Sequence, residues 1–306
     1  MIAAGVHGGD GAKLARALGV APDEVLDLSA SLNPLAPDPT PVLAAHLDSI
    51  RSYPDPEPAG ASVAAAIGVD PETLLLTNGA AEAIALVAAE MPVGSVEDPE
   101  FSLYRRHLGV LDPTAPRWRS NPHNPTGALA GAGEEAGVWD ESFWPLCTGS
   151  WTRGDAGLGA VVIGSLTKLL ACPGLRVGYV LCPDRAMRER LAARQPAWSV
   201  NGLVCAALPE MLAAVELARW AREVAKLRER LGGCLRRHGL APLASDANWL
   251  LVDAPGLRER LAARGVLVRD CASFGMPGVV RIAVPSPSGL DRLDSALAET
   301  LAAAPS

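Results

Sequence analysis

The chain has 306 residues, of which 27 are Lys or Arg and 34 are Asp or Glu, so its net charge is −7. This charge argues against binding of nucleic acid through a basic face, and the lack of an apolar run of about 18 residues argues against a membrane-spanning helix. The six cysteines form no CxxC pair, which indicates reduced thiols rather than a metal site. Apolar residues make up 49% of the chain, and its first ten residues do not resemble a signal peptide, so we expect a cytoplasmic globular protein, very often an enzyme.

Short helical patterns and apolar strands alternate along the first two thirds of the chain. Helices are predicted over residues 11–18, 61–67 and 80–90, and strands over residues 25–28, 73–77, 160–163 and 177–181. Continuous apolar strands that alternate with helices are typical of a largely parallel sheet covered on both faces. The fold class is therefore α/β.

A different order follows in the last third of the chain. Residues 209–237 have a long helical pattern, with apolar residues at helical spacing and Arg and Glu between them. Strand, helix, strand, strand and helix patterns then succeed one another at residues 249–252, 257–264, 265–269, 279–284 and 290–303. This order predicts a separate, smaller α+β domain, with the long helix as a bridge.

A lysine directly follows one of the buried strands. The segment Ser165-Leu-Thr-Lys168 comes after residues 160–163, and Arg176 lies eight residues further on. Burial lowers the pKa of a lysine and makes it a good nucleophile toward a carbonyl carbon. The hydroxyls of Ser165 and Thr167 and the guanidinium of Arg176 suit a phosphate. The alternative is a surface lysine with ordinary neighbours.

Three motifs precede this lysine. In Thr77-Asn-Gly-Ala-Ala-Glu82 a strand turns through glycine into a helix, which offers the N–H groups of Ala80 and Ala81 to a phosphate. Two Asn-Pro steps make a rigid turn, in which the amide of Asn124 is able to donate to a ring oxygen. Asp140 ends a short apolar segment, and if buried it needs a partner such as a protonated pyridine nitrogen. Each motif alone also fits an ordinary turn or helix cap.

The order of these four motifs resembles that of the fold-type I PLP-dependent enzymes in the aminotransferase class I/II superfamily, over nearly the whole chain. The resemblance implies a mainly parallel sheet sandwiched by helices, and pyridoxal 5'-phosphate (PLP) as the cofactor. It also implies an N-terminal arm at residues 1–45 that packs on the small domain and the active site. A large PLP-binding domain would span residues 46–208, and the bridging helix with the small domain residues 209–306.

The same resemblance implies roles for individual residues. Lys168 would bind the cofactor as an imine, and Asp140 would pair with the pyridine nitrogen. Phe101 would stack on the ring, and Arg281 would bind the substrate carboxylate. The remaining cofactor contacts would be Asn124 at the phenolic oxygen, and Ser165, Arg176, Ala80 and Ala81 at the phosphate, with the Thr167 hydroxyl as a further candidate from its place in the lysine motif. Tyr53 matches the tyrosine that reaches the phosphate in the neighbouring subunit, which implies a homodimer.

The N-terminal segment narrows the expected reaction. His7 and the segment Leu26-Asp-Leu-Ser-Ala-Ser-Leu-Asn-Pro34 resemble the start of the L-threonine-O-3-phosphate decarboxylases of cobalamin biosynthesis, which are relatives of the histidinol-phosphate aminotransferases. By this resemblance His7 and Asn33 would lie near the substrate. Arg269 is a candidate for the substrate phosphate, and a solvated arginine at a strand end is the alternative.

The expected function is therefore PLP-dependent decarboxylation of L-threonine O-3-phosphate to (R)-1-amino-2-propanol O-phosphate. Phe143 supports it, because many aminotransferases have a tyrosine three residues after the aspartate and the decarboxylases similarly carry Phe. Two alternatives stay open: an aminotransferase acting on a phosphorylated amine such as histidinol phosphate, and a catalytically silent relative. The segments between Tyr104 and Asn121 and between Gly127 and Asp140 are short for the family, so we expect a trimmed large domain.

Overall fold

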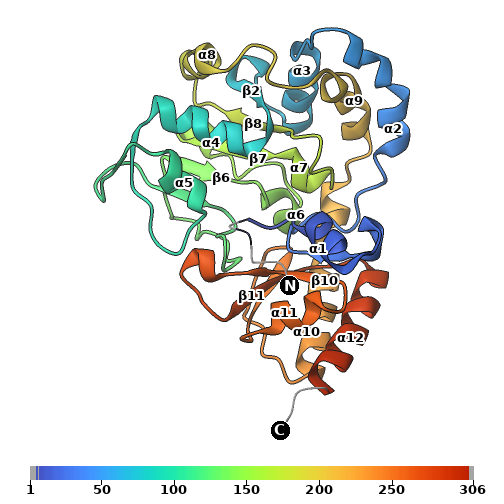
Figure 1. Cartoon of the computed structure of the whole chain (residues 1–306). Coiled ribbons are helices and arrows are strands. Elements are labelled where there is room, and N and C mark those ends of the chain that lie inside the picture. Colours follow the sequence, from blue (N-terminus) through green and yellow to red (C-terminus); the bar gives the residue numbers. More distant parts are fainter. Residues whose placement is uncertain (1–4, 6, 303–306) are drawn as a thin grey trace.

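Two sheets organise the chain, as the computed structural model shows for residue 5 and residues 7–302 (Figure 1). The strand order of the larger sheet is β2-β8-β7-β6-β5. Four of these five strands run in one direction, and β8 runs against both of its neighbours. The predicted α/β fold with a mainly parallel sheet is confirmed. The strands are β2 (Leu74–Thr77), β5 (Trp118–Ser120), β6 (Val138–Asp140), β7 (Val161–Ser165) and β8 (Gly178–Leu181).

Helices cover both faces of the larger sheet because its strands are apolar on both sides. Ile163 packs in the core on one face, and its neighbour Val162 packs in the core on the other. The first face is covered by α4 (Gly79–Glu90), α5 (Ser102–His107) and α8 (Arg185–Arg194). The second is covered by α3 (Glu57–Ile67), α9 (Gly202–Ala213) and the first turns of α10 (Leu217–Arg237). Beside β5, a bridge between Ser95 and Arg117 connects the pair β3 (Val93–Gly94) and β4 (Val110–Leu111).

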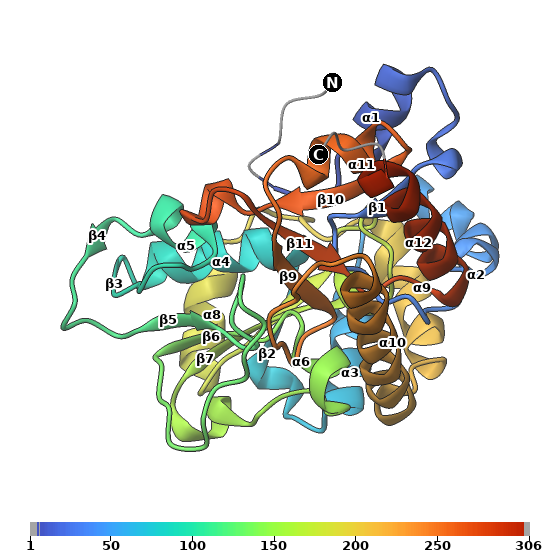
Figure 2. The ribbon, with the colours of Figure 1, turned by 90° about the horizontal axis from the view of Figure 1, so that it is seen from below.

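The smaller sheet has the order β1-β10-β11-β9. Its first strand comes from the N-terminal segment and runs parallel to β10, whereas the other two pairings are antiparallel. One face packs on α10, α11 (Leu257–Ala262) and α12 (Pro287–Ala302), of which α10 and α12 lie side by side in Figure 2. The other face carries Arg269 and Arg281 toward the larger sheet. The strands are β1 (Leu26–Leu28), β9 (Trp249–Asp253), β10 (Val266–Asp270) and β11 (Val279–Ala283).

The helix predicted over residues 209–237 is wrong in its extent. The chain forms two helices there, α9 and α10, and Pro209 lies inside the first. The periodicity hides the break at residues 214–216 because Leu212 and Leu217, on either side of it, are both buried in the same core. The remaining short helices are α1 (Gly11–Leu18), α2 (Thr40–Ala45), α6 (Trp144–Thr148) and α7 (Leu166–Leu169). None of the helices described is long and apolar enough to cross a membrane.

The connection from β5 to β6 is held by an arginine rather than by a helix. Residues 121–137, all of which are described, contain turns and irregular chain but no helix or strand. The guanidinium groups of Arg119 and Arg153 lie 5.6 and 4.9 Å from the ring centre of Trp139. Nη2 of Arg153 also donates at 3.0–3.3 Å to the carbonyl oxygens of Gly131, Ala132 and Glu134. Arg153 therefore ties this connection to the sheet.

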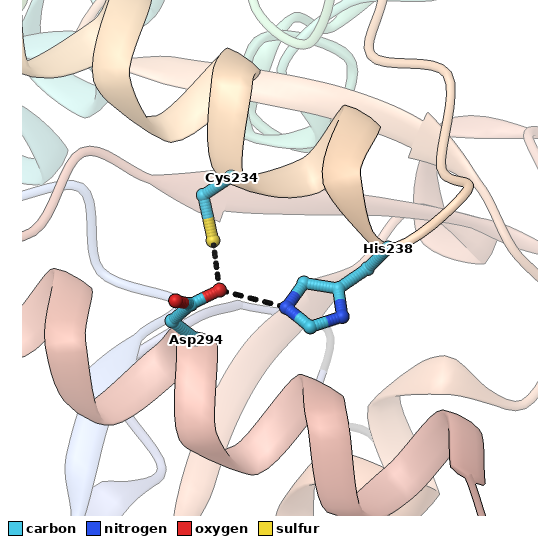
Figure 3. Close-up of side chains that lie close together, drawn as sticks. All are labelled: Cys234, His238 and Asp294. Carbon is cyan, nitrogen blue, oxygen red and sulfur yellow. Dashed lines mark hydrogen bonds and ion pairs between the residues drawn. The ribbon is translucent and has the colours of Figure 1, made fainter.

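A carboxylate joins α10 to α12 (Figure 3). Oδ1 of Asp294 accepts a hydrogen bond from the thiol of Cys234 at 3.2 Å and lies 2.7 Å from Nε2 of His238. Its other oxygen accepts from Arg237 at 3.3 Å. Cysteine, histidine and aspartate are residue types that bind zinc, but here a guanidinium already pairs with the carboxylate and each ligand atom has a protein partner. These bonds lower the pKa of Asp294, and we interpret the cluster as a tie between two helices.

Replacement of Arg153 tests whether it stabilises the trimmed connection. Arg153→Ala removes the stacking on Trp139 and three hydrogen bonds, so we expect the free energy of unfolding to fall by about 2–3 kcal/mol. Urea unfolding followed by circular dichroism measures the change. Arg230 is an exposed arginine of α10, and Arg230→Ala is the matched control, with an expected change below about 0.5 kcal/mol. Equal effects of the two substitutions would contradict the role of Arg153.

Candidate active site

The site lies where the strands of the larger sheet end. Ser120, the last residue of β5, pairs with Asp140, the last residue of β6. Ser165 at the end of β7 pairs with Gly178, whose other partner is Thr77 at the end of β2. The carboxyl ends of these four strands therefore share one edge, the usual place for a ligand in such sheets. A cavity of about 280 Å³ opens there, and Arg269 and Arg281 line its opposite wall.

Lys168 lies on α7, directly after β7, and its side chain enters this cavity. Its Nζ donates to the carbonyl oxygen of Ala30 at 3.0 Å and lies 5.9 Å from the ring centre of Phe143. Burial, and then the positive charges of Arg281 and Arg176, lower the pKa of Lys168 to about 8. An amine with this pKa has a sizeable neutral fraction near neutral pH, as attack on a carbonyl requires.

Asp140 is buried in the same cavity. Its Oδ2 accepts a hydrogen bond from the Tyr104 hydroxyl at 2.8 Å, and its Oδ1 accepts from the backbone N–H of Ser142 at 3.0 Å. Burial raises the pKa of Asp140, while these bonds and the charge of Lys168 act in the opposite direction. A buried carboxylate held in this way is suited to a cationic partner such as a protonated ring nitrogen.

The start of α4 and Arg176 form a polar cup beside the lysine. Gly79 has φ +75°, and a side chain there would place its Cβ 2.6 Å from Nη2 of Arg176. A Cβ on Gly178 would lie 2.7 Å from the backbone nitrogen of Ala80. Both glycines are therefore required for this close approach. Helix N–H groups without intrahelical partners, together with a guanidinium, are suited to a phosphate. The cavity wall here comprises Ala80, Ala81, Ser165, Thr167 and Arg176.

A hydrogen bond connects the predicted cofactor residue Asn124 with Arg281. Nη1 of Arg281 donates to Oδ1 of Asn124 at 2.6 Å, and both side chains are buried. The amide oxygen of Asn124 accepts this hydrogen bond, and its amide NH2 group is left to donate to a ligand. Burial, and the nearby charge of Arg269, lower the pKa of Arg281 to about 10.

Arg269 and Arg281 are direct neighbours across two strands. They form a register pair between β10 and β11, and both are buried. Arg269 donates to the carbonyl of Gly5 at 3.0 Å and to the hydroxyl of Ser273 at 2.9 Å. Like charges in this arrangement are unfavourable, so an anionic ligand between them would stabilise both.

Phe101 and His7 also line the cavity. Phe101 lies in the wall, with its ring centre 5.7 Å from that of Tyr104. The imidazole of His7 meets Phe101 edge to face at 5.8 Å. Partial burial and the charges of Arg269 and Arg106 lower the pKa of His7.

The structure does not bring two of the predicted residues into the cavity. Asn33 is buried, and its side-chain amide donates to the carbonyl of Leu169 at 2.9 Å, so it holds the N-terminal segment against α7. Tyr53 is 78% exposed and stacks on Trp198, with ring centres 4.4 Å apart. The contacts predicted for Asn33 with substrate and for Tyr53 with a neighbouring subunit stay predictions.

The sequence interpretation missed Tyr104 and Ser120. Tyr104 bonds Asp140, and Ser120 accepts a hydrogen bond from the backbone of Asn124 at 2.7 Å. Two signals were available. Tyr104 follows Phe101 by three residues, a spacing at which side chains near the start of a helix are neighbours, and the structure places Phe101 directly before α5 with the two rings in contact. Ser120 ends the strand directly before the asparagine turn, where the ends of parallel strands meet.

These residues fit PLP. The cavity combines an amine of lowered pKa, a buried carboxylate able to face a ring nitrogen, an amide donor and a cup of phosphate donors. Lys168, Asp140, Asn124 and the cup formed by α4 and Arg176 are the residues that would hold these groups of the cofactor. The arrangement suits the chemistry of amino acids bound at a ring that accepts electrons.

Comparison with known proteins agrees with this fit. The family model described as aminotransferase class I and II matches residues 135–297, more than half of the chain. A threonine-phosphate decarboxylase of Salmonella typhimurium is 30% identical, over 96% of each chain. A histidinol-phosphate aminotransferase of Halorubrum lacusprofundi is 28% identical, over 95% of this chain and 93% of its own. The first alignment has 355 positions, more than the 306 residues of this chain, so the relative carries insertions.

Solved structures share the fold. The histidinol-phosphate aminotransferase of Sinorhizobium meliloti in complex with PLP superposes with a TM-score of 0.81 at 18% identity, over 94% of each chain. The L-threonine-O-3-phosphate decarboxylase of Porphyromonas gingivalis has a TM-score of 0.77 at 22% identity, over 91% of this chain and all of its own. The chain belongs to the aminotransferase class I and II family, and its cofactor is pyridoxal 5'-phosphate.

Proposed function

We propose that this enzyme decarboxylates L-threonine O-3-phosphate to (R)-1-amino-2-propanol O-phosphate. The observation that carries the proposal is the buried pair of Arg269 and Arg281 in one cavity wall. L-Threonine O-3-phosphate carries a carboxylate and a phosphate, which are the two kinds of anion that guanidinium groups bind most strongly. The 30% identical relative that is named threonine-phosphate decarboxylase supports the same substrate.

Lys168 and Asp140 are the proposed catalytic residues. PLP, when bound, accepts the electron pair of the bond that breaks at Cα. The Asp140 carboxylate holds a proton at the pyridine nitrogen, and Asn124 donates to the phenolic oxygen. Arg281 orients the departing carboxylate, and Arg269 binds the substrate phosphate, with His7 nearby. The ammonium form of Lys168, or a water, then gives a proton to Cα in place of the carboxylate that leaves as CO2.

The second candidate is an aminotransferase acting on a phosphorylated amine such as histidinol phosphate. The position of Lys168 supports it, because the same amine can remove a proton from Cα instead of returning one. Several relatives are named for this reaction. Phe143 favours the decarboxylase, because it stands where many aminotransferases have a tyrosine and has no hydroxyl to donate. Its ring packs edge to face on Trp249 at 4.7 Å. A silent relative has less support, since the amine, the carboxylate and the phosphate donors line one cavity.

We further propose that the enzyme is a homodimer in the cytoplasm. Leu47, Ile50, Tyr53 and Trp198 are 52–78% exposed, which leaves apolar side chains that a second copy would cover. The six cysteines are free thiols, as in a reducing compartment.

Sedimentation of the PLP-loaded protein tests the oligomeric state, and Trp198→Glu is expected to shift a dimer toward monomer.

The pH dependence of PLP uptake tests Lys168. The neutral fraction of its amine rises with pH to a midpoint of about 8. We therefore expect the rate at which apoprotein takes up PLP to rise about tenfold per pH unit below pH 7 and to level off above about pH 9. Stopped-flow absorbance measures this rate. Lys168→Ala is expected to abolish the lysine-bound absorbance, and Lys226→Ala, at an exposed lysine of α10, to leave it unchanged. A rate that still rises steeply above pH 9 would contradict the lowered pKa.

Carbon dioxide release tests the reaction and the two arginines. With L-threonine O-3-phosphate and no oxo acid, the PLP-loaded enzyme is expected to release CO2. Arg269→Gln removes one charged partner of the phosphate, so kcat/KM is expected to fall about 10²-fold or more, mainly through KM. L-Threonine, which lacks the phosphate, is the control substrate, and Arg269→Gln should change its turnover little.

Two outcomes would contradict this account. Consumption of 2-oxoglutarate in step with the amine, without CO2, would identify an aminotransferase. Equal losses of kcat/KM by Arg269→Gln for both substrates would show that Arg269 does not bind the phosphate.

A further inference from the structure

Glu100 is a buried carboxylate for which the proposed reaction has no role. It is 7% exposed and lies just before α5, behind the cavity rather than in its wall. Burial of an ionisable group is costly unless hydrogen bonds compensate it. Three such bonds are present: Oε1 accepts from Ser120 Oγ at 2.5 Å and from the Phe101 N–H at 2.8 Å, and Oε2 accepts from the Ser120 N–H at 2.9 Å.

The Ser120 hydroxyl links Glu100 to Asn124 through two hydrogen bonds. The hydroxyl of Ser120 has one hydrogen, and that hydrogen is donated to Glu100. The hydroxyl oxygen then accepts the backbone N–H of Asn124 at 2.7 Å. Because one partner takes the hydrogen and the other faces a lone pair, the carboxylate sets the direction of the hydroxyl. Two hydrogen bonds therefore fix Asn124. Its backbone N–H donates to the Ser120 hydroxyl, and its amide oxygen accepts from Arg281.

We propose that Glu100 is a positioning residue of the cofactor site, which through the Ser120 hydroxyl holds Asn124 where its amide nitrogen donates to the phenolic oxygen of PLP. The inference rests on the proposed role of Asn124. Glu100 itself touches neither cofactor nor substrate, and its effect reaches the cofactor only through Ser120 and Asn124.

Charged and titratable groups surround Glu100 on each side. Asp140 on β6 and Tyr104 on α5 face it, Nε2 of His123 lies 3.9 Å from Oε2, and Arg119 on β5 lies within electrostatic range. Burial and the charge of Asp140 raise the pKa of Glu100 to about 7, against its hydrogen bonds. Below this pH the carboxyl group of Glu100 carries a proton and has one acceptor position fewer. The hydrogen bond that it accepts from the Ser120 hydroxyl is then weaker.

Two other roles for Glu100 make different predictions. A purely structural role, as an acceptor for the backbone at the start of α5, affects stability and leaves the bound cofactor unchanged. A purely electrostatic role acts through the negative charge, which favours protonated forms of the cofactor without any need for Ser120. The positioning role requires both the carboxylate and the hydroxyl.

The titration of the bound cofactor separates these roles. A donor at the phenolic oxygen favours the deprotonated form of the lysine-bound cofactor, so a weaker bond from Asn124 raises its pKa. We expect Glu100→Gln and Ser120→Ala each to shift the midpoint of the visible absorbance titration upward by about 0.5 to 1 pH unit, the equivalent of one net hydrogen bond. The double variant should shift it no further, because both residues act through one bond.

Glu141→Gln is the matched control. Glu141 is buried, and burial also raises its pKa to about 7. Its carboxylate accepts a hydrogen bond from the backbone N–H of Arg153 at 3.1 Å rather than from Ser120. The substitution is expected to lower stability and to leave the absorbance titration in place. If Glu100→Gln does not fold, Ser120→Ala keeps the carboxylate and tests the link alone.

The outcomes separate this inference from the proposed site. Upward shifts in both variants support the inference. A downward shift in Glu100→Gln with none in Ser120→Ala would overturn it in favour of a charge effect, and no shift in either would overturn it in favour of a structural role. Absence of lysine-bound absorbance in the unmodified protein would overturn the proposed site, and the inference with it.

Discussion

Five charged side chains, Asp140, Lys168, Arg176, Arg269 and Arg281, line one cavity, and the two sheets hold them there. Charges removed from water are costly unless each has a partner. Protein groups supply some of these partners, such as the Tyr104 hydroxyl for Asp140 and the Ala30 carbonyl for Lys168. A bound cofactor with a ring nitrogen, a carbonyl and a phosphate would add partners for Asp140, Lys168 and Arg176.

The partners come from segments that are distant along the chain. The N-terminal segment adds β1 to the smaller sheet and places the carbonyl of Ala30 beside Lys168. The register of β5 and β6 places Ser120 beside Asp140. No helix connects these two strands, and Arg153 instead bonds the connection between them. The larger sheet therefore has the edge at which the site is built although a short connection without a helix joins β5 to β6.

The sequence was most informative where chemistry depends on local order. Lys168 after its strand, the glycine turn before Ala80 and the asparagine turn at Asn124 were predictable, because each is a short segment with its own geometry. Glu100 was not, because its role depends on hydrogen bonds with Ser120, which lies 20 residues further along the chain on β5. The helix break at residues 214–216 was hidden because the apolar pattern continues across it.

The fate of the Cα hydrogen in heavy water tests the proposed reaction most directly. The PLP-loaded enzyme would be incubated with L-threonine O-3-phosphate in ²H₂O, and product and remaining substrate examined by NMR. Decarboxylation predicts an amine whose C1 keeps the original hydrogen and gains one deuterium in place of the carboxylate. Substrate that retains its carboxylate and exchanges its Cα hydrogen for deuterium, with no amine formed, would contradict decarboxylation and indicate proton removal from Cα instead.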